Sequence, residues 1–315
     1  MSTFKFVTFL ALGAVFFMGS PDTISISGAQ AKTVKHKKNK RKKKINRKAA
    51  SDKKKKAVAK KKEEDKLPIG GFVGIQQGIP AKDGKIKGTD LLAYAAYKVN
   101  DEHSFSLFQG GSIAYAPGGF SVWDSFLADN WSMGKLWGLK WGLRTSFTLP
   151  ISEGSQKEEL YSNLGMRLSV GYSKDILTLQ YRPSAVYHWR RWSTKELTDE
   201  QKAEGRPYGD PTRMMTLNHQ FIVSLALNDE WSANAEINSS YLVNNRNADQ
   251  EKRGVPFGTT GSYSFDFGVG YAPVPEWAFT VGFTNGDSYL KEGAYSVYLY
   301  DVNSSNFYGN VLYNF

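Results

Sequence analysis

The chain has no cysteine among its 315 residues, which excludes the class of small secreted domains held together by disulfides. From Leu67 onward, apolar residues nowhere recur with the helical period of 3.6 over a convincing length, and this argues against a soluble α/β enzyme. Histidine occurs only four times, and no metal-ligand spacing links the four residues. We therefore expect neither a cofactor nor a metal.

Residues 1–31 have the pattern of an export signal. A single lysine precedes an apolar run near residues 6–18, which is short for a transmembrane helix, and residues 29–31 form a small-x-small cleavage site. We expect cleavage after Ala31, with an uncleaved N-terminal anchor as the alternative. The absence of cysteine agrees with export.

Residues 32–66 form a lysine-rich tail with 19 Lys or Arg and 4 Asp or Glu, a net charge of +15. The whole chain carries +11, so residues 67–315 carry −4 and the basic character belongs to the tail alone. The tail has no aromatic residue that could stack on a base, so we expect no nucleic-acid partner. Its like charges repel one another, which predicts a disordered or partly helical segment.

The remainder of the chain, residues 67–315, alternates large apolar residues with small or polar ones. Tyr263, Phe265 and Phe267 share one face of such a stretch, and residues 277–283 and 137–147 repeat the pattern. This period of two predicts β-strands separated by turns. A soluble sandwich could show the same period, so the decision between sandwich and membrane barrel depends on the lengths of the links.

Short and long links alternate along residues 67–315. Short links are expected at residues 99–103, 132–135, 172–176, 227–231 and 272–277, and longer polar links at 81–89, 116–119, 151–159, 191–213, 245–261 and 286–305. Transmembrane β-barrels have short periplasmic turns and longer external loops. The sequence therefore predicts an all-β fold, a closed antiparallel transmembrane barrel of about 12 strands. The strand centres are expected near residues 74, 94, 109, 125, 142, 166, 182, 220, 238, 267, 281 and 311.

The last residues, "NVLYNF", place Val311, Tyr313 and Phe315 on one face of a strand. This ending resembles the C-terminal signature of Gram-negative outer-membrane β-barrel proteins, in which a final aromatic and alternating apolar residues serve as the assembly signal; Gly309 breaks the pattern further upstream. The resemblance implies that the last strand pairs with the first, that the apolar face meets outer-membrane lipid, and that the barrel assembly machinery is a partner. It extends to residues 67–315 only in general pattern, and no particular family is indicated.

Alternation also predicts which charged residues face the interior of the barrel. Three sequential strands turn inward a basic wall of Lys140, Arg144, Arg167 and Arg182, with His188 and Arg190 nearer the mouth, and later strands turn inward Glu236 and Asp266. Opposed walls of this kind would set up a field across the bore that favours anions. A filled interior with paired charges is the alternative.

Enzymatic readings find little support in the residues. His219 lies on a lipid-facing position like the histidine of outer-membrane phospholipases, but Phe221 stands where their serine would be, and His188 with Asp210 is a weak match to a protease cluster at the rim. We expect a non-enzyme, a porin-like channel for small polar or anionic solutes in the outer membrane. The alternative is a structural barrel whose basic periplasmic tail tethers it to peptidoglycan or anionic lipid.

Overall fold

The computed structural model describes residues 68–116, 118–206, 209–245, 259–291, 294–295 and 297–315. The expected signal peptide and the lysine-rich tail lie outside these residues. No helix in the described part of the chain is long and apolar enough to cross a membrane.

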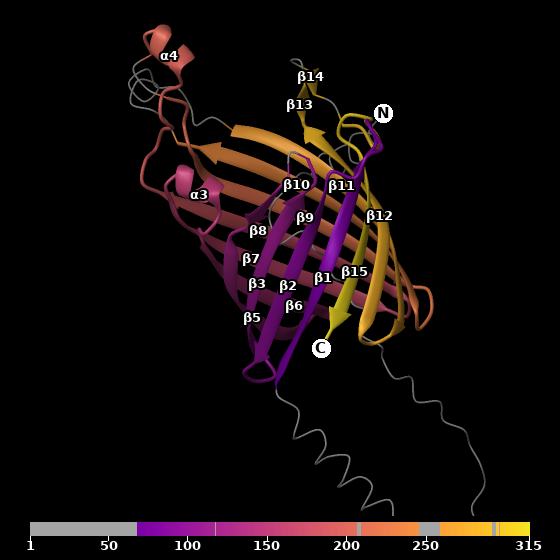
Figure 1. Ribbon diagram of the computed structural model, residues 1–315. Coiled ribbons are helices and arrows are strands. Elements are labelled where there is room, and N and C mark those ends of the chain that lie inside the picture. The colour runs from indigo at the N-terminus through magenta and orange to yellow at the C-terminus, as the bar shows by residue number, and fades with distance from the viewer. Residues whose placement is uncertain (1–67, 117, 207–208, 246–258, 292–293, 296) are drawn as a thin grey trace, which may run out of the picture.

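Twelve long antiparallel strands of the described residues form a closed barrel (Figure 1). They are β1 (Ile69–Pro80), β2 (Gly88–Lys98), β3 (His103–Ala114), β5 (Ser125–Leu136), β6 (Leu139–Leu149), β7 (Leu160–Lys174), β8 (Leu177–Arg190), β9 (Arg213–Ala226), β10 (Trp231–Asn244), β11 (Thr259–Val274), β12 (Trp277–Ser288) and β15 (Asn306–Asn314). Each of the twelve predicted centres falls within one of these strands, so the predicted fold is confirmed.

The barrel closes where the last strand meets the first. β15 pairs with β1 from Phe72 opposite Asn314 to Pro80 opposite Asn306, and β1 pairs on its other side with β2. Beyond this ladder the backbone N–H of Phe315 donates to the carbonyl of Gly71 at 3.0 Å, and the N–H of Gly71 donates back at 3.2 Å. The predicted closure is confirmed, and the start of β1 and the end of β15 lie at the same end of the barrel.

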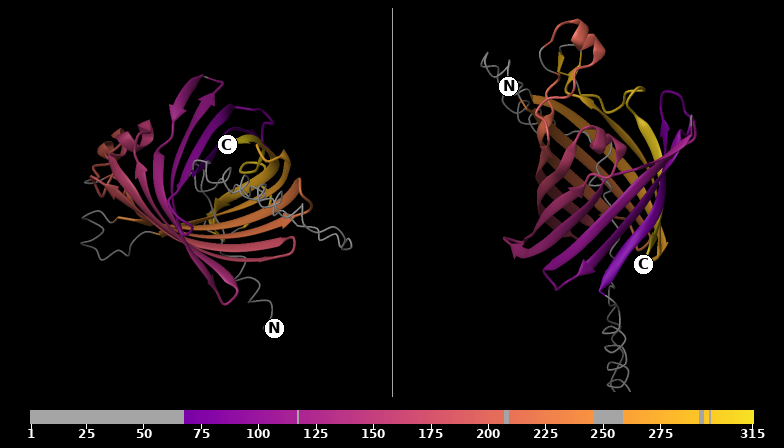
Figure 2. Two further views of the ribbon diagram at one scale, coloured as in Figure 1. Left: turned by 90° about the horizontal axis from the view of Figure 1, so that it is seen from below. Right: turned by 60° about the vertical axis from the view of Figure 1, so that its left-hand side comes forward.

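The described parts of the long links gather at the opposite end. Two short helices, α3 (Glu153–Lys157) and α4 (Asp199–Ala203), lie there with the small hairpin of β13 (Leu290–Lys291) and β14 (Ala294–Tyr295), away from the C-terminus (Figures 1 and 2). Each helix begins with a hydroxyl cap, because Ser152 accepts from the N–H of Ser155 and Thr198 accepts from that of Gln201. Three of the links at this end therefore contain regular secondary structure among their described residues.

The link between β5 and β6 differs from the prediction. The expected turn at residues 132–135 is instead an irregularity within β5, where the register shifts between Ser132 and Gly134. The chain reverses at Trp137 and Gly138, whose φ angles of 53° and 79° are both positive, as a two-residue type I′ hairpin requires. Trp137 therefore belongs to the turn and not to the lipid-facing strand on which it was expected.

Two strands pair with β3 on the side where a single strand near residue 125 was predicted. β4 (Gly119–Val122) pairs with the upper part of β3, and β5 pairs with its lower part. Trp123 lies at the break, and its ring covers Gly110 so closely that a Cβ there would come within 2.2 Å of Trp123 Cε3. At the same point the N–H of Trp123 donates to the carbonyl of Gly110 at 3.0 Å, so the residue between β4 and β5 still bonds to β3.

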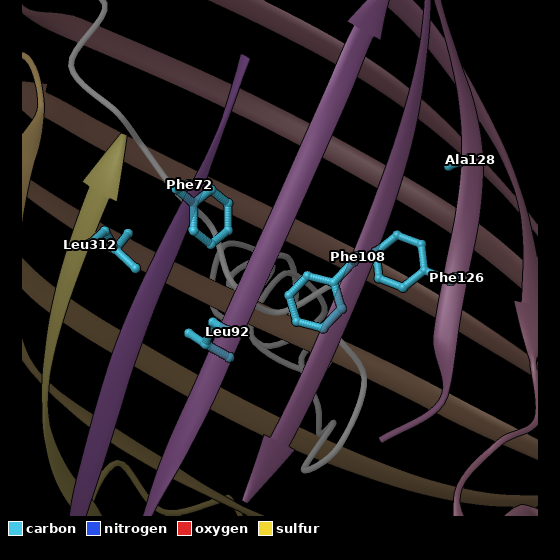
Figure 3. Packing of buried hydrophobic residues seen from close by; sticks show 6 residues of the cluster. All are labelled: Phe72, Leu92, Phe108, Phe126, Ala128 and Leu312. Atoms are coloured by element: carbon cyan, nitrogen blue, oxygen red, sulfur yellow. The ribbon is translucent and has the colours of Figure 1, made fainter. Parts of the chain in front are cut away.

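The two faces of the wall have different surroundings. Leu91 is 36% exposed on the outer face and Leu92, the next residue, is 4% exposed on the inner face; Leu107 and Phe108 show the same contrast, 44% against 2%. A lipid-facing outer surface explains why so many large apolar residues are exposed. The inner face holds an apolar cluster that alternation alone did not predict (Figure 3): Phe72, Leu92, Phe108, Phe126, Ala128 and Leu312.

One part of the outer face is covered by protein. The segment at residues 297–305 packs against β11 and β12, where the N–H of Tyr298 donates to the hydroxyl of Tyr263 at 2.8 Å and Ser305 donates to Asn285 at 3.1 Å. Tyr263, expected to meet lipid, is only 1% exposed for this reason.

Candidate functional site

The arginine cluster, defined as Arg144, Arg167 and Arg182, lies at mid-height on three adjacent strands, β6, β7 and β8. Arg144 and Arg167 are direct cross-strand partners, and Arg167 is in turn opposite Ser184. Like charges at such positions repel, so their side chains must be held by other contacts. The guanidinium carbon of Arg144 lies 4.7 Å from the centre of the Phe126 ring, a cation–π contact that holds it against the wall.

Arg182 is held by amide oxygens. Its Nη2 donates to Gln180 Oε1 at 2.5 Å, and its Nη1 lies 3.4 Å from Gln220 Oε1 on the neighbouring strand β9. Gln220 then donates from Nε2 to Glu236 Oε1 at 2.7 Å, and Asn238 donates to the same oxygen at 2.6 Å. A continuous polar chain thus runs along the wall from the arginine cluster to Glu236.

The acidic pair, Glu236 and Asp266, occupies directly opposed positions on β10 and β11. The predicted arrangement of basic and acidic walls facing each other across the bore is wrong, because only β9 separates β8 from β10. Strands are about 4.8 Å apart, so the two charged sets are neighbours on one arc. Arg182 and Arg167 are close enough to act electrostatically on Glu236.

The strand diametrically opposite β7 is β15, six strands away in either direction. The aromatic wall, defined as Phe72, Tyr94, Phe108 and Phe126, begins next to β15 on β1 and continues over β2 and β3 to β5, beside the arginine cluster. Phe72 stacks on Tyr94 with ring centres 5.3 Å apart, and Phe108 stacks on Phe126 at 5.2 Å. The interior is therefore divided into an aromatic arc, an arginine arc and an acidic arc, and the arginine arc adjoins the aromatic one where Arg144 covers Phe126.

Tyr308 of β15 connects the acidic pair to the closing strands. Its hydroxyl donates to Asp266 Oδ1 at 2.8 Å, and its ring crosses Gly282 of β12, where a Cβ would come within 2.3 Å of Tyr308 Cζ. Only glycine leaves space for the ring at this position. The sequence shows Gly282 only as a small residue in an alternating stretch, so the contact could not be read from it.

Gly282→Ala is expected to displace the ring of Tyr308 and break its hydrogen bond to Asp266. Because the added methyl group clashes with this ring, we expect the free energy of unfolding to fall by about 1 to 3 kcal/mol. Urea unfolding of the barrel in detergent micelles measures the change. Gly78→Ala is the matched control, since its Cβ would meet nothing closer than 4.0 Å. Equal stability of both variants would contradict the role assigned to Gly282.

The other predicted interior residues lie toward the two ends of the barrel. Lys140 is exposed beside Lys135 near the short links. Arg190, at the long-link end, forms an ion pair with Glu158 of the α3 link. His188 lies beside the same end, with Nδ1 2.7 Å from Asn163 Oδ1 and Nε2 2.8 Å from Thr216 Oγ1.

The contacts of His188 and Asp210 do not join these two residues, which were considered as a protease cluster. His188 engages Asn163 and Thr216, whereas Asp210 accepts from Gln201 at 3.1 Å and Arg206 at 3.2 Å. Among the described residues, no group of three His, Asp or Glu side chains could hold a metal ion.

His219 also lacks a nucleophile partner. Its Nδ1 is 2.7 Å from the hydroxyl of Tyr181, and Phe221 stacks on the same tyrosine. The histidine that resembled a phospholipase residue therefore belongs to an aromatic group between β8 and β9.

The C-terminal residues of interest lie on the outer face. Tyr313 meets Trp277 edge to face with ring centres 5.2 Å apart. Phe315 packs over Gly71, where a Cβ would come within 2.8 Å of Phe315 Cζ. Val311 pairs with Ile75 and Phe279 across the closing strands. All three residues therefore contact the seam that closes the barrel.

No family model matches the sequence, and comparison with curated proteins finds no relative. Among solved structures, an outer membrane channel from Pseudomonas putida F1 is similar with a TM-score of 0.52 and 9% identity, over 78% of this chain and 95% of that chain. The two proteins share the fold of a closed antiparallel β-barrel. The barrel also aligns with the NanC porin (TM-score 0.48, 11% identity, 76% of this chain and 98% of that chain) and the KdgM porin (TM-score 0.46, 7% identity, 78% of this chain and 99% of that chain). At these identities the likeness concerns the fold.

Proposed function

We propose that the barrel is a porin-like channel of the outer membrane for small polar or anionic solutes. The observation that carries the proposal is the arginine cluster, three guanidinium groups at mid-height on neighbouring strands. The similar P. putida barrel is named an outer membrane channel, and the same role is proposed here. Lys140 and Arg190 extend the basic arc toward its two ends.

The arginine cluster suits anion passage for two reasons. Guanidinium groups stay charged at all physiological pH values, and their planar donors match carboxylate and phosphate oxygens. Rings of fixed positive charge raise the local concentration of anions and lower the barrier to their entry. The aromatic wall adjoins the cluster on one side and the acidic pair lies beyond β9 on the other, so a solute carrying a negative charge and an apolar face would be oriented with its charge at the cluster and its apolar face on the wall.

The proposal is tested by incorporating the purified barrel into planar bilayers under a gradient of potassium chloride. A reversal potential of the sign set by chloride is the result that agrees with it. A barrel that folds and inserts without conducting would rule out the channel and leave the structural alternative.

That alternative rests on the charge of +15 in residues 32–66. The start of β1 shares one end of the barrel with the end of β15, and with that end in the periplasm the tail would reach peptidoglycan carboxylates or anionic lipid. Deleting residues 33–66 is expected to leave the barrel folded and to abolish its retention on isolated peptidoglycan. Retention should also fall with added salt, because salt screens exposed lysines. Equal retention of both forms in a sedimentation assay would remove the tether.

A further inference from the structure

An apolar groove of about 1060 Å³ runs over the outer face of β9, β10, β11, β12, β15 and β1. Two rows of cross-strand partners build it. The first row is Ile79, Phe307, Phe283, Phe267, Ala235 and Val223, and the second is Gln77, Gly309, Val281, Val269, Ala233 and Leu225. Small residues at Gly309, Ala233 and Ala235 lower the surface between larger neighbours, which produces the hollow.

The groove has the length and direction of a lipid tail. Six strands at about 4.8 Å spacing span about 24 Å. Strands of transmembrane barrels tilt by roughly 40°, so a row perpendicular to them rises by about 15 Å, half of the roughly 30 Å hydrocarbon core. An acyl chain confined to one leaflet would therefore follow the groove from its upper end to its lower end.

The upper end of the groove is polar and basic. Gln77 donates to Thr89 Oγ1 at 2.9 Å and to the hydroxyl of Tyr115 at 3.1 Å, all on the outer face. Ile86 of the link between β1 and β2 lines the groove. This link (residues 81–87) carries three lysines and a single carboxylate.

The single carboxylate of the link, Asp83, is neutralised by a lysine of the same link. Asp83 forms an ion pair with Lys87 at 2.7 Å, and the hydrogen bond from Lys87 lowers the pKa of Asp83, so the pair stays ionised and internally balanced. Lys82 and Lys85 are exposed and give the upper end of the groove a net positive charge.

We propose that the groove holds an acyl chain of a phosphate-bearing lipid of the outer leaflet, with the phosphate at Lys82 and Lys85. The assignment to the outer leaflet rests on the proposed outer-membrane function, with the start of β1 and the end of β15 taken to face the periplasm. A second copy of the barrel fits less well, because a convex wall would leave the hollow empty and would bring the lysines of both copies together.

The test uses lipid A, an acylated sugar phosphate, as the probe and phosphatidylcholine as the comparison. Native mass spectrometry of the full-length barrel in non-ionic detergent measures bound lipid at several lipid concentrations. Ala235→Phe fills the floor of the groove and is expected to weaken lipid A binding about tenfold through lost chain burial. Reversal of both lysines, Lys82→Glu with Lys85→Glu, is expected to weaken it about thirtyfold.

Ala185→Phe is the matched control, because Ala185 lies on the outer face of β8, opposite Met166 and away from the groove. It should bind lipid A as the wild type does. Ala233→Leu fills the second row and replaces Ala235→Phe if that variant does not fold, as judged by heat-dependent gel mobility. Unchanged binding by a folded filled variant, or equal binding of phosphatidylcholine and lipid A to the wild type, would overturn the proposal. A dimer that disappears on filling would assign the groove to a second copy instead.

Discussion

Reversing the arginine cluster, with Arg144, Arg167 and Arg182 all changed to Glu, is expected to convert an anion-preferring barrel into a cation-preferring one. The change moves six units of charge on one arc of the interior, and fixed charges in a confined bore alter ion entry by about tenfold or more. The anion-to-cation permeability ratio should fall by at least this factor. The measurement is the reversal potential in planar bilayers under a salt gradient.

A control with the same total change of charge separates the field of the bore from net charge. Lys157, Lys195 and Lys202 lie in the long links with exposed side chains, and their replacement by Glu should leave the permeability ratio within a factor of about two, because salt screens exposed charges.

The folded fraction of the arginine variant decides between the two interpretations of the interior. Removing one partner from a buried, paired charge costs about 3 to 5 kcal/mol, so a filled interior with paired charges predicts unfolding. A folded variant with reversed preference agrees with a channel. Loss of the folded band on a gel would instead assign the arginines to structure.

Deleting Phe315, or changing it to Asp, is expected to abolish most of the folded barrel in membranes. Phe315 packs over Gly71 and continues the ladder between β15 and β1 by two backbone hydrogen bonds, so a charge there would sit at the lipid-facing seam. On the lipid face of a barrel, Arg or Lys costs about 2 to 4 kcal/mol at mid-depth, and both Asp and positions near the interface cost less. The larger part of the expected loss therefore comes from the resemblance to the assembly signal, whose recognition the change would remove. Heat-modifiable gel mobility of isolated membranes reports the folded fraction.

The control for this prediction is Phe120→Asp, at an equally exposed aromatic residue of β4 near the opposite end. This variant should assemble in wild-type amounts. If deletion of Phe315 gave the same folded band as the wild type, the assembly role proposed for the C-terminal residues would be wrong.

The strands and their order could be predicted because each rests on information within a short stretch. Alternation of large and small residues indicated the strands near residues 142, 220 and 267. The alternation of short and long links indicated that each strand pairs with the next one in the sequence. The turn at Trp137 was missed because a bulge at Gly134 lengthens β5, and a bulge adds a residue without changing composition.

The interior was predicted less completely, because it depends on register between strands. Each inward position was read from its own strand, and no single strand shows that Arg144 faces Arg167 or that Gln220 joins Arg182 to Glu236. The aromatic wall did leave a signal in the sequence, as adjacent apolar pairs such as Leu91 with Leu92 and Leu107 with Phe108. In a strict alternation the second residue of each pair would be polar or small, so a large apolar residue there indicates an apolar patch on the inner face.

The seam between β1 and β15 has a consequence for the time course of folding. Phe72 and Asn314 are partners that lie about 240 residues apart in the chain, so we expect this ladder to form after the ladders between strands that are neighbours in sequence. Until then both strands expose unpaired backbone edges to any other extended chain. We therefore expect closure to be slow and late. Until the nine residue pairs between β1 and β15 have formed, the barrel can pair with other copies of itself and aggregate.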